Sequence, residues 1–240
     1  PTLKKLSFEM GGKSANIVMA DADLDLAVKE SLRGIFTNQG EVCLAGSRLM
    51  VERPIYDEFL ARLVDGAADW TLGNPLDPST RMGPLVSEEH LDKVLSYIDL
   101  AQEEGAKLMT GGHRVTDGEL AKGNYVAPTI FADADNSMRV CQDEIFGPVE
   151  MVMPFDDVDE AIEIANQSRF GLAGMVWTQN LNTAHKVARD VKAGTMWVNC
   201  FFVRDLRAPF GGYKDSGMGR EGGEYSHEFF TEAKAVVMKF

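Results

Sequence analysis

Residues 15–51 read ANIVMADADLDLAVKESLRGIFTNQGEVCLAGSRLMV, and this stretch decides the fold class. It opens and closes on short apolar runs, Asn16 to Met19 and Arg48 to Val51, whose length and composition are typical of strands. Between them, apolar residues recur every three or four positions from Leu24 to Ile35, which predicts an amphipathic helix over Asp23 to Phe36. A strand, a helix and a second strand in this order favour a parallel sheet.

The same alternation continues along the chain. Further strands are predicted at Tyr125 to Phe131, Met151 to Phe155, Gly174 to Trp177 and Thr195 to Val198. Further helices are predicted at Ile55 to Ala67, after a capping Ser87, at Asp157 to Asn166 and at Asn182 to Val191. We therefore expect an α/β fold, a largely parallel sheet with helices on both faces, which ends in a C-terminal strand for oligomerisation.

Composition excludes several classes of function. The chain has 24 Lys and Arg against 37 Asp and Glu, a net charge of −13, and no basic run, so nucleic acid and anionic membranes are poor partners. No apolar stretch is long enough to span a bilayer. The three cysteines, Cys43, Cys141 and Cys200, are too few and too far apart for a disulfide framework or a CxxC metal site. We expect a cytoplasmic protein without a metal.

Two glycine-rich segments resemble nucleotide-binding motifs only superficially. Gly12-Lys13-Ser14 ends like a phosphate-binding loop, but the glycine required five residues earlier is Ser7. Residues 217–222, GMGREG, satisfy the dinucleotide pattern, yet they follow a polar loop instead of a strand. A tight glycine-rich loop is the better interpretation of the second segment.

Two other stretches carry reactive side chains. In residues 8–15, FEMGGKSA, the carboxylate of Glu9 ends a strand-like run, and two glycines let the backbone come close to a bound group. In residues 36–48, FTNQGEVCLAGSR, Cys43 lies on a turn between a helix and a strand. Taken singly, Glu9 could be an exposed loop glutamate and Cys43 an inert buried cysteine.

Together the two stretches resemble the active-site glutamate and cysteine signatures of the aldehyde dehydrogenase superfamily, in the family's order. Residues 143–149, DEIFGPV, resemble the loop that this family places beside the nicotinamide. The segments GNP at 73–75, RMGP at 81–84 and PFGG at 209–212 also resemble family landmarks. The resemblance covers essentially the whole chain.

The resemblance implies that Cys43 is the nucleophile. Its thiolate would attack an aldehyde to form a thiohemiacetal, and loss of hydride would give a thioester that water must hydrolyse. Glu9 would be the base that activates this water. Because a free thiol has a pKa of about 8.5, we expect the site to lower the pKa of Cys43 through dipoles, the positive nicotinamide ring or a base.

The resemblance also assigns residues to a cofactor, NAD or NADP. Glu144 would bind the hydroxyls of the nicotinamide ribose, Phe146 would pack near the ring, and Met10 would offer its backbone to it. Glu221 matches a second carboxylate with a role in proton relay, although a salt bridge with its neighbours explains it equally well.

The substrate-side loop, residues 199–210, NCFFVRDLRAPF, resembles that of the 2-hydroxymuconate and 2-aminomuconate semialdehyde dehydrogenases. Arginine offers a carboxylate a bidentate partner, so Arg204, or less favourably Arg207, would bind the distal carboxylate of a semialdehyde. Alternatively, Arg204 pairs with Asp205 or Asp215.

By the same resemblance, residues 1–15 end a strand of the cofactor domain and its linker, 16–232 form the catalytic domain, and 233–240 form the oligomerisation strand. The complete enzyme would be a homo-oligomer acting on a small aldehyde. We expect the N-terminal NAD-binding domain to be absent, so that the isolated chain neither binds NAD tightly nor oxidises aldehydes. Two alternatives are a cofactor-independent thiol esterase and a catalytically silent oligomerisation module.

Overall fold

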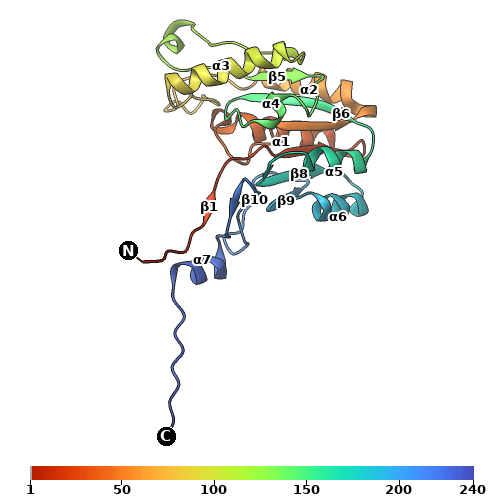
Figure 1. Ribbon diagram of the computed structural model, residues 1–240. Helices are drawn as coiled ribbons and strands as arrows, with labels where there is room; N and C mark the ends of the chain where they lie inside the picture. The colour runs from red at the N-terminus through yellow and green to blue at the C-terminus, as the bar shows by residue number, and fades with distance from the viewer. Residues whose placement is uncertain (1) are drawn as a thin grey trace.

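A seven-stranded sheet forms the centre of the computed structural model, which describes residues 2–240 (Figure 1). The strand order is β4-β5-β6-β3-β2-β8-β9, and every neighbouring pair is parallel except β4 with β5. The strands are β2 (Ala15–Val18), β3 (Arg48–Glu52), β4 (Lys107–Thr110), β5 (Thr129–Ala132), β6 (Val149–Phe155), β8 (Ala173–Trp177) and β9 (Thr195–Val198). The predicted α/β class with a largely parallel sheet is confirmed.

Helices cover both faces of this sheet because successive strand residues point to opposite sides. On one face, α1 (Leu24–Phe36) and α2 (Tyr56–Ala67) pack on a core that includes Leu49 and Val51. On the other face, α3 (Glu88–Glu103), α5 (Val158–Asn166) and α6 (Leu181–Asp190) pack on a core that includes Met50. Two shorter helices, α4 (Arg139–Gln142) and α7 (Gly223–Phe230), complete the set of α-helices among the described residues.

Side-chain caps fix where the helices begin. Asp23 accepts the N–H of Leu26 at the start of α1, and Ser87 accepts the N–H of His90 at the start of α3. Asp157 and Asn180 cap α5 and α6 in the same way. The predicted helices therefore agree with the observed ones to within one or two residues.

Two short antiparallel pairs fold the C-terminal part of the chain back onto its beginning. β1 (Phe8–Glu9) pairs with β11 (Gly217–Met218), and β7 (Phe170–Gly171) pairs with β10 (Tyr213–Lys214). The Met10 N–H then donates to the Ser216 carbonyl at 2.9 Å. Residues distant in sequence are thereby brought to the strand that carries Glu9.

Two predictions about strands need correction, and a third concerns pairing with another chain. The strand-like run that ends at Glu9 forms a strand only over Phe8–Glu9. The strand predicted from Tyr125 begins at Thr129, directly after Pro128, which has no N–H to donate to a neighbouring strand. Residues 233–240 form no strand within this chain. Their backbone extends away from the body (Figure 1), and their side chains are exposed. Pairing of this segment with another chain stays a prediction. Among residues 2–240, no helix combines the length and apolar character needed to cross a membrane.

A buried arginine links the sheet to its connecting loops. Arg48, at the start of β3, is 2% exposed and donates to the carbonyls of Lys13 (3.0 Å), Ile164 (2.9 Å) and Ala165 (3.0 Å). It also donates to Oδ1 of Asn136 at 2.9 Å. One side chain thus fixes the segment before β2 and the end of α5 relative to β3.

We expect Arg48→Ala to lower the free energy of unfolding by about 3 kcal/mol or more, because each buried carbonyl left unpaired costs about 1–3 kcal/mol. Urea denaturation followed by circular dichroism measures the change. Arg53→Ala is the matched control, since Arg53 forms an exposed ion pair with Asp156 and such pairs contribute about 1 kcal/mol at most. Equal losses for the two variants would contradict the role assigned to Arg48.

Candidate active site

Three loops that carry the predicted site residues meet at one edge of the sheet. The segments that enter β2, β3 and β6 contain Glu9, Cys43 and Glu144, and these strands are adjacent and parallel in the order β6-β3-β2. Loops that lead into neighbouring parallel strands lie at the same edge. The topology therefore explains why side chains so far apart in sequence come together.

Two glycines allow the loops to touch. The Gly12 N–H donates to Oε1 of Glu144 at 2.9 Å. A Cβ atom on Gly12 would lie 2.2 Å from the Cys43 carbonyl oxygen, and one on Gly11 would lie 2.3 Å from Oε2 of Glu144. Any side chain at these positions would overlap the residues of the site, which is the close approach that glycine permits.

The loop that ends at Cys43 follows α1 through a short 3₁₀ turn, Thr37–Gly40. Gly40 has a φ of 79°, and a Cβ there would lie 2.2 Å from the Gly147 carbonyl oxygen. This is a second point at which the loops of Cys43 and Glu144 are in contact. Cys43 itself is half-buried, whereas Cys141 is buried completely.

The electrostatic surroundings of Cys43 differ from the expectation. Burial raises the pKa of the Cys43 thiol, and the negative charges of Glu144 and Glu9 raise it further. The sequence predicts that dipoles, the positive nicotinamide ring or a base lower this pKa, and the contribution of the ring stays a prediction. The residues of this chain instead favour the neutral thiol, so activation requires proton removal or positive charge from elsewhere.

Glu9 lies on β1 as an exposed residue that is only partly covered by its surroundings, among charged residues of the C-terminal segment. Burial and the charge of Glu221 raise the pKa of Glu9, while Arg220, Arg204 and a hydrogen bond from the Gly212 backbone lower it. The net effect is upward, which makes Glu9 a stronger base than an ordinary glutamate. The structure thus places the charges of Glu221 and Arg204 within range of Glu9, and their predicted roles stay predictions.

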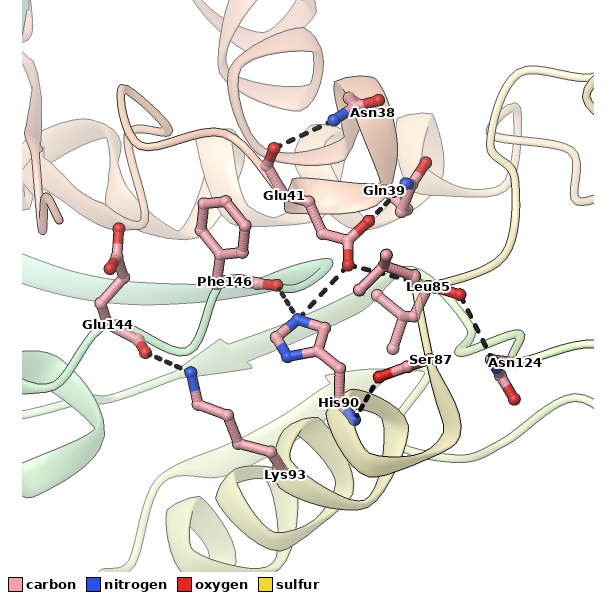
Figure 2. Close-up of polar contacts among 11 residues, drawn as sticks. Asn38, Gln39, Glu41, Leu85, Ser87, His90, Lys93, Asn124, Glu144 and Phe146 are labelled. Atoms are coloured by element: carbon pink, nitrogen blue, oxygen red, sulfur yellow. Dashed lines mark hydrogen bonds and ion pairs between the residues drawn. The ribbon is translucent and has the colours of Figure 1, made fainter. Parts of the chain in front are cut away.

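Glu144 and Phe146, two of the three residues assigned to the cofactor, lie on the loop before β6, and Met10 follows β1. Gly12 engages only Oε1 of the half-buried Glu144, so Oε2 is available to a ligand hydroxyl. Phe146 has a φ of 61°, in the left-handed region, and its carbonyl accepts a hydrogen bond from Nε2 of His90 at 2.6 Å (Figure 2). The side chain of Met10 is exposed, and its N–H is already engaged by Ser216.

The two candidate substrate arginines have different surroundings. Arg207 forms an ion pair with Asp205 at 2.6 Å, and both side chains are exposed. Arg204 forms no ion pair within residues 2–240; its guanidinium lies 4.5 Å from the centre of the Phe210 ring. Arg204 also lines a cavity of about 350 Å³ together with Trp197 and Glu221. The geometry therefore favours Arg204 over Arg207 as a ligand for an anion.

Sequence reasoning missed His90 and Glu41. Nε2 of His90 lies 3.5 Å from Oε1 of Glu41, a residue two positions before Cys43. Lys93, one turn further along α3, donates to the Glu144 carbonyl at 3.1 Å (Figure 2). Nothing in the local pattern marks these residues, since they look like ordinary members of a polar helix face and a loop.

The match to a family model and the similarity to individual proteins agree on one family. Residues 1–236 match the model of the aldehyde dehydrogenase family. The chain is 50% identical to a 2-hydroxymuconic semialdehyde dehydrogenase of Pseudomonas sp. strain CF600, over 99% of this chain and 49% of the relative. It is 47% identical to a 2-aminomuconic semialdehyde dehydrogenase of Danio rerio, over 100% of this chain and 50% of the relative. The chain thus spans about half the length of the curated relatives it matches.

Solved structures show the same relationship. An indole-3-acetaldehyde dehydrogenase in complex with NAD+ superposes with a TM-score of 0.94 at 48% identity, over 99% of this chain and 48% of the other. An aldehyde dehydrogenase from Pseudomonas aeruginosa superposes with a TM-score of 0.93 at 48% identity, over 97% and 47% of the two chains.

The two glycines give a paired prediction. Gly12→Ala must displace backbone, so we expect it to lower the free energy of unfolding by about 1–3 kcal/mol. Gly11→Ala meets only the end of the Glu144 side chain, so it should move that carboxylate away and cost only the Gly12–Glu144 hydrogen bond, about 1 kcal/mol or less. Because the charge of Glu144 raises the pKa of Cys43, Gly11→Ala should shift the pH profile of Cys43 alkylation to lower pH.

Denaturation and mass-spectrometric measurement of iodoacetamide alkylation check both effects. A Cys200→Ser background removes the other partly exposed thiol. The interpretation is wrong if Gly11→Ala leaves the alkylation profile of Cys43 unchanged, or if it destabilises the protein as much as Gly12→Ala.

Proposed function

Because this chain belongs to the aldehyde dehydrogenase family, we propose that it forms the catalytic half of an NAD(P)-dependent aldehyde dehydrogenase that oxidises an aldehyde to an acid. The observation that supports this best is the meeting of Cys43, Glu9 and Glu144 at one edge of the sheet. Formation and hydrolysis of a thioester require a thiol and a base close to each other, and Cys43 and Glu9 supply these two groups.

The residues on the loop before β6 fit a nicotinamide cofactor. Oε2 of Glu144 is available to accept hydrogen bonds from ribose hydroxyls, and the Phe146 ring offers an apolar contact beside it. When bound, the nicotinamide supplies the hydride acceptor that the protein side chains lack.

In the proposed reaction, the Cys43 thiol releases its proton to solvent, and the thiolate sulfur forms a bond to the aldehyde carbon while the carbonyl π electrons move to the oxygen, which gains the negative charge. Loss of a hydride from this carbon, for which the bound cofactor would be the acceptor, lets the oxygen re-form the carbonyl and leaves the acyl group on Cys43 as a thioester. Glu9 then takes a proton from a water molecule, whose oxygen attacks the thioester carbon and expels the Cys43 thiolate. The raised pKa of Glu9 favours this proton transfer at neutral pH.

The proposed substrate is a semialdehyde that carries a distal carboxylate. Arg204 lines the cavity beside Phe210 and forms no ion pair within the described chain, so its guanidinium can receive a carboxylate from the substrate. Two of the relatives are named for muconic semialdehydes, which agrees with this substrate class.

Trapping of the acyl group on Cys43 tests the covalent step. In a protein that includes this chain and a cofactor-binding domain, Cys43→Ala should abolish NAD reduction. Glu9→Gln should still acylate but hydrolyse about 10²–10⁴-fold more slowly, the usual effect of losing a general base. Intact-mass spectrometry should then show an acyl adduct on Cys43. Glu224→Gln, a change at an exposed glutamate of α7, is the control. An adduct that forms without aldehyde oxidation or on another cysteine would contradict the mechanism.

The substrate assignment is tested by comparing two substrates. Arg204→Ala should raise KM about 10–100-fold for a carboxylated semialdehyde, the equivalent of a lost charge-assisted hydrogen bond, and should change KM little for an uncharged aldehyde. Arg207→Ala, which removes a nearby arginine already paired with Asp205, is the matched control. Equal effects of Arg204→Ala on both substrates would rule out carboxylate recognition.

A further inference from the structure

His90 lies between the two loops that the proposed function assigns to the nucleophile and the cofactor. It belongs to the first turn of α3, where its N–H donates to Oγ of Ser87, and its side chain is 14% exposed. Figure 2 shows the ring directed at the Phe146 carbonyl and at the Glu41 carboxylate. A carbonyl oxygen only accepts hydrogen bonds, so Nε2 of His90 must carry the hydrogen.

Glu41 fixes the position of the His90 ring from the side of Cys43. Its carboxylate is 8% exposed and is held on both oxygens, since Oε1 accepts from the Val86 N–H at 3.1 Å and Oε2 accepts from Nε2 of Gln39 at 2.5 Å. The same Oε1 lies 3.5 Å from Nε2 of His90. The Cys43 loop and the start of α3 are therefore joined through one carboxylate.

Phe146 needs such support. Its φ of 61° places a bulky residue in the left-handed region, a conformation that costs about 1–3 kcal/mol and persists only where the surroundings hold it. His90 supplies a short hydrogen bond to its carbonyl, and the two rings pack edge to face with centres 6.0 Å apart. Both contacts come from the same side chain.

We propose that His90, held by Glu41, is a positioning residue that keeps the Phe146 backbone in its left-handed conformation and couples the nicotinamide-side loop to the Cys43 loop. This inference rests on the proposed function, since it is the proposed cofactor that gives the orientation of Phe146 its importance. His90 acts through Phe146 and Glu41 and touches no reacting atom. Its loss lets the loop relax without removing any group that performs the chemistry.

The test uses nuclear magnetic resonance of the 240-residue chain. The ¹³Cα and ¹³Cβ shifts of Phe146 report its backbone conformation, and amide exchange at Gly12 reports the contact with Glu144. In His90→Ala, the Phe146 shifts should move away from left-handed values. Exchange at Gly12 should rise about threefold to tenfold, the equivalent of one hydrogen bond.

Two variants separate positioning from general stability. His90→Gln retains an amide N–H that can reach the Phe146 carbonyl, so it should restore the Phe146 shifts towards those of the unmodified chain. His113→Ala is the matched control, because His113 also contacts a backbone carbonyl, that of Gly111, but lies on an exposed segment outside both loops. It should change neither signal.

Unchanged Phe146 shifts in a folded His90→Ala protein would overturn the proposal, and so would a His90→Gln protein that resembles His90→Ala. If His90→Ala fails to fold, Glu41→Gln replaces it, since the amide keeps an acceptor for Val86 and loses the charge that faces His90. The Phe146 shifts must then move in the same direction, and unchanged shifts reject the coupling. These signals require neither cofactor nor turnover, so their failure is distinguishable from a failure of the Cys43 trapping experiment.

Discussion

The close approach of the Gly12 backbone to Cys43 is the constraint on which the site depends. With no Cβ on Gly12, the carbonyl of Cys43 and the carboxylate of Glu144 can both lie against the same peptide segment. Glu9 is three residues earlier in that segment and is the last residue of β1, so β1 ends just before the turn that admits the contact. A single short stretch thereby fixes the relative positions of a thiol, a candidate base and a candidate cofactor ligand.

This proximity has an electrostatic cost. The carboxylates of Glu144 and Glu9 both act on the Cys43 thiol and raise its pKa, and burial acts in the same direction. Arg204 and Arg220 offset the charge around Glu9, yet Glu9 still has a raised pKa because burial and Glu221 prevail. The surroundings of Cys43 in this chain therefore favour its neutral thiol, and a positive charge placed beside the sulfur would act in the opposite direction.

Much of the fold was predictable from sequence because periodicity reports burial directly. The stripe from Leu24 to Ile35 and the apolar runs of β2 and β3 are consequences of facing a core, so they identify α1 and its flanking strands. The same reasoning fails for Lys13 and Glu150, two buried charges that it would place on the surface. Burial lowers the pKa of Lys13 to about 8 and raises that of Glu150 well above its ordinary value. The burial of Lys13 and Glu150 arises only from the folded sheet, so the local sequence does not indicate it.

Site residues divide in a similar way. Cys43, Glu9 and Glu144 lie in glycine-containing segments that have a distinctive local sequence, whereas His90 and Glu41 acquire their importance only from the packing of α3 against two loops. Two-residue strands such as β1 and β11 also lack a pattern of their own, because each is defined by its partner.

The stability of the sheet and the geometry of the site have a common origin in Arg48. Its guanidinium binds the Lys13 carbonyl, and Lys13 directly follows the glycine that touches Cys43. Arg48 is itself the first residue of β3, the strand that the Cys43 loop enters. The buried arginine therefore holds the two segments together in the interior, and the absence of a side chain on Gly12 lets them come into contact at the site. The hydrogen bonds of Arg48 lie in the interior, where solvent does not compete for them. They therefore oppose the repulsion between the carboxylates of Glu9 and Glu144 and keep the two loops together.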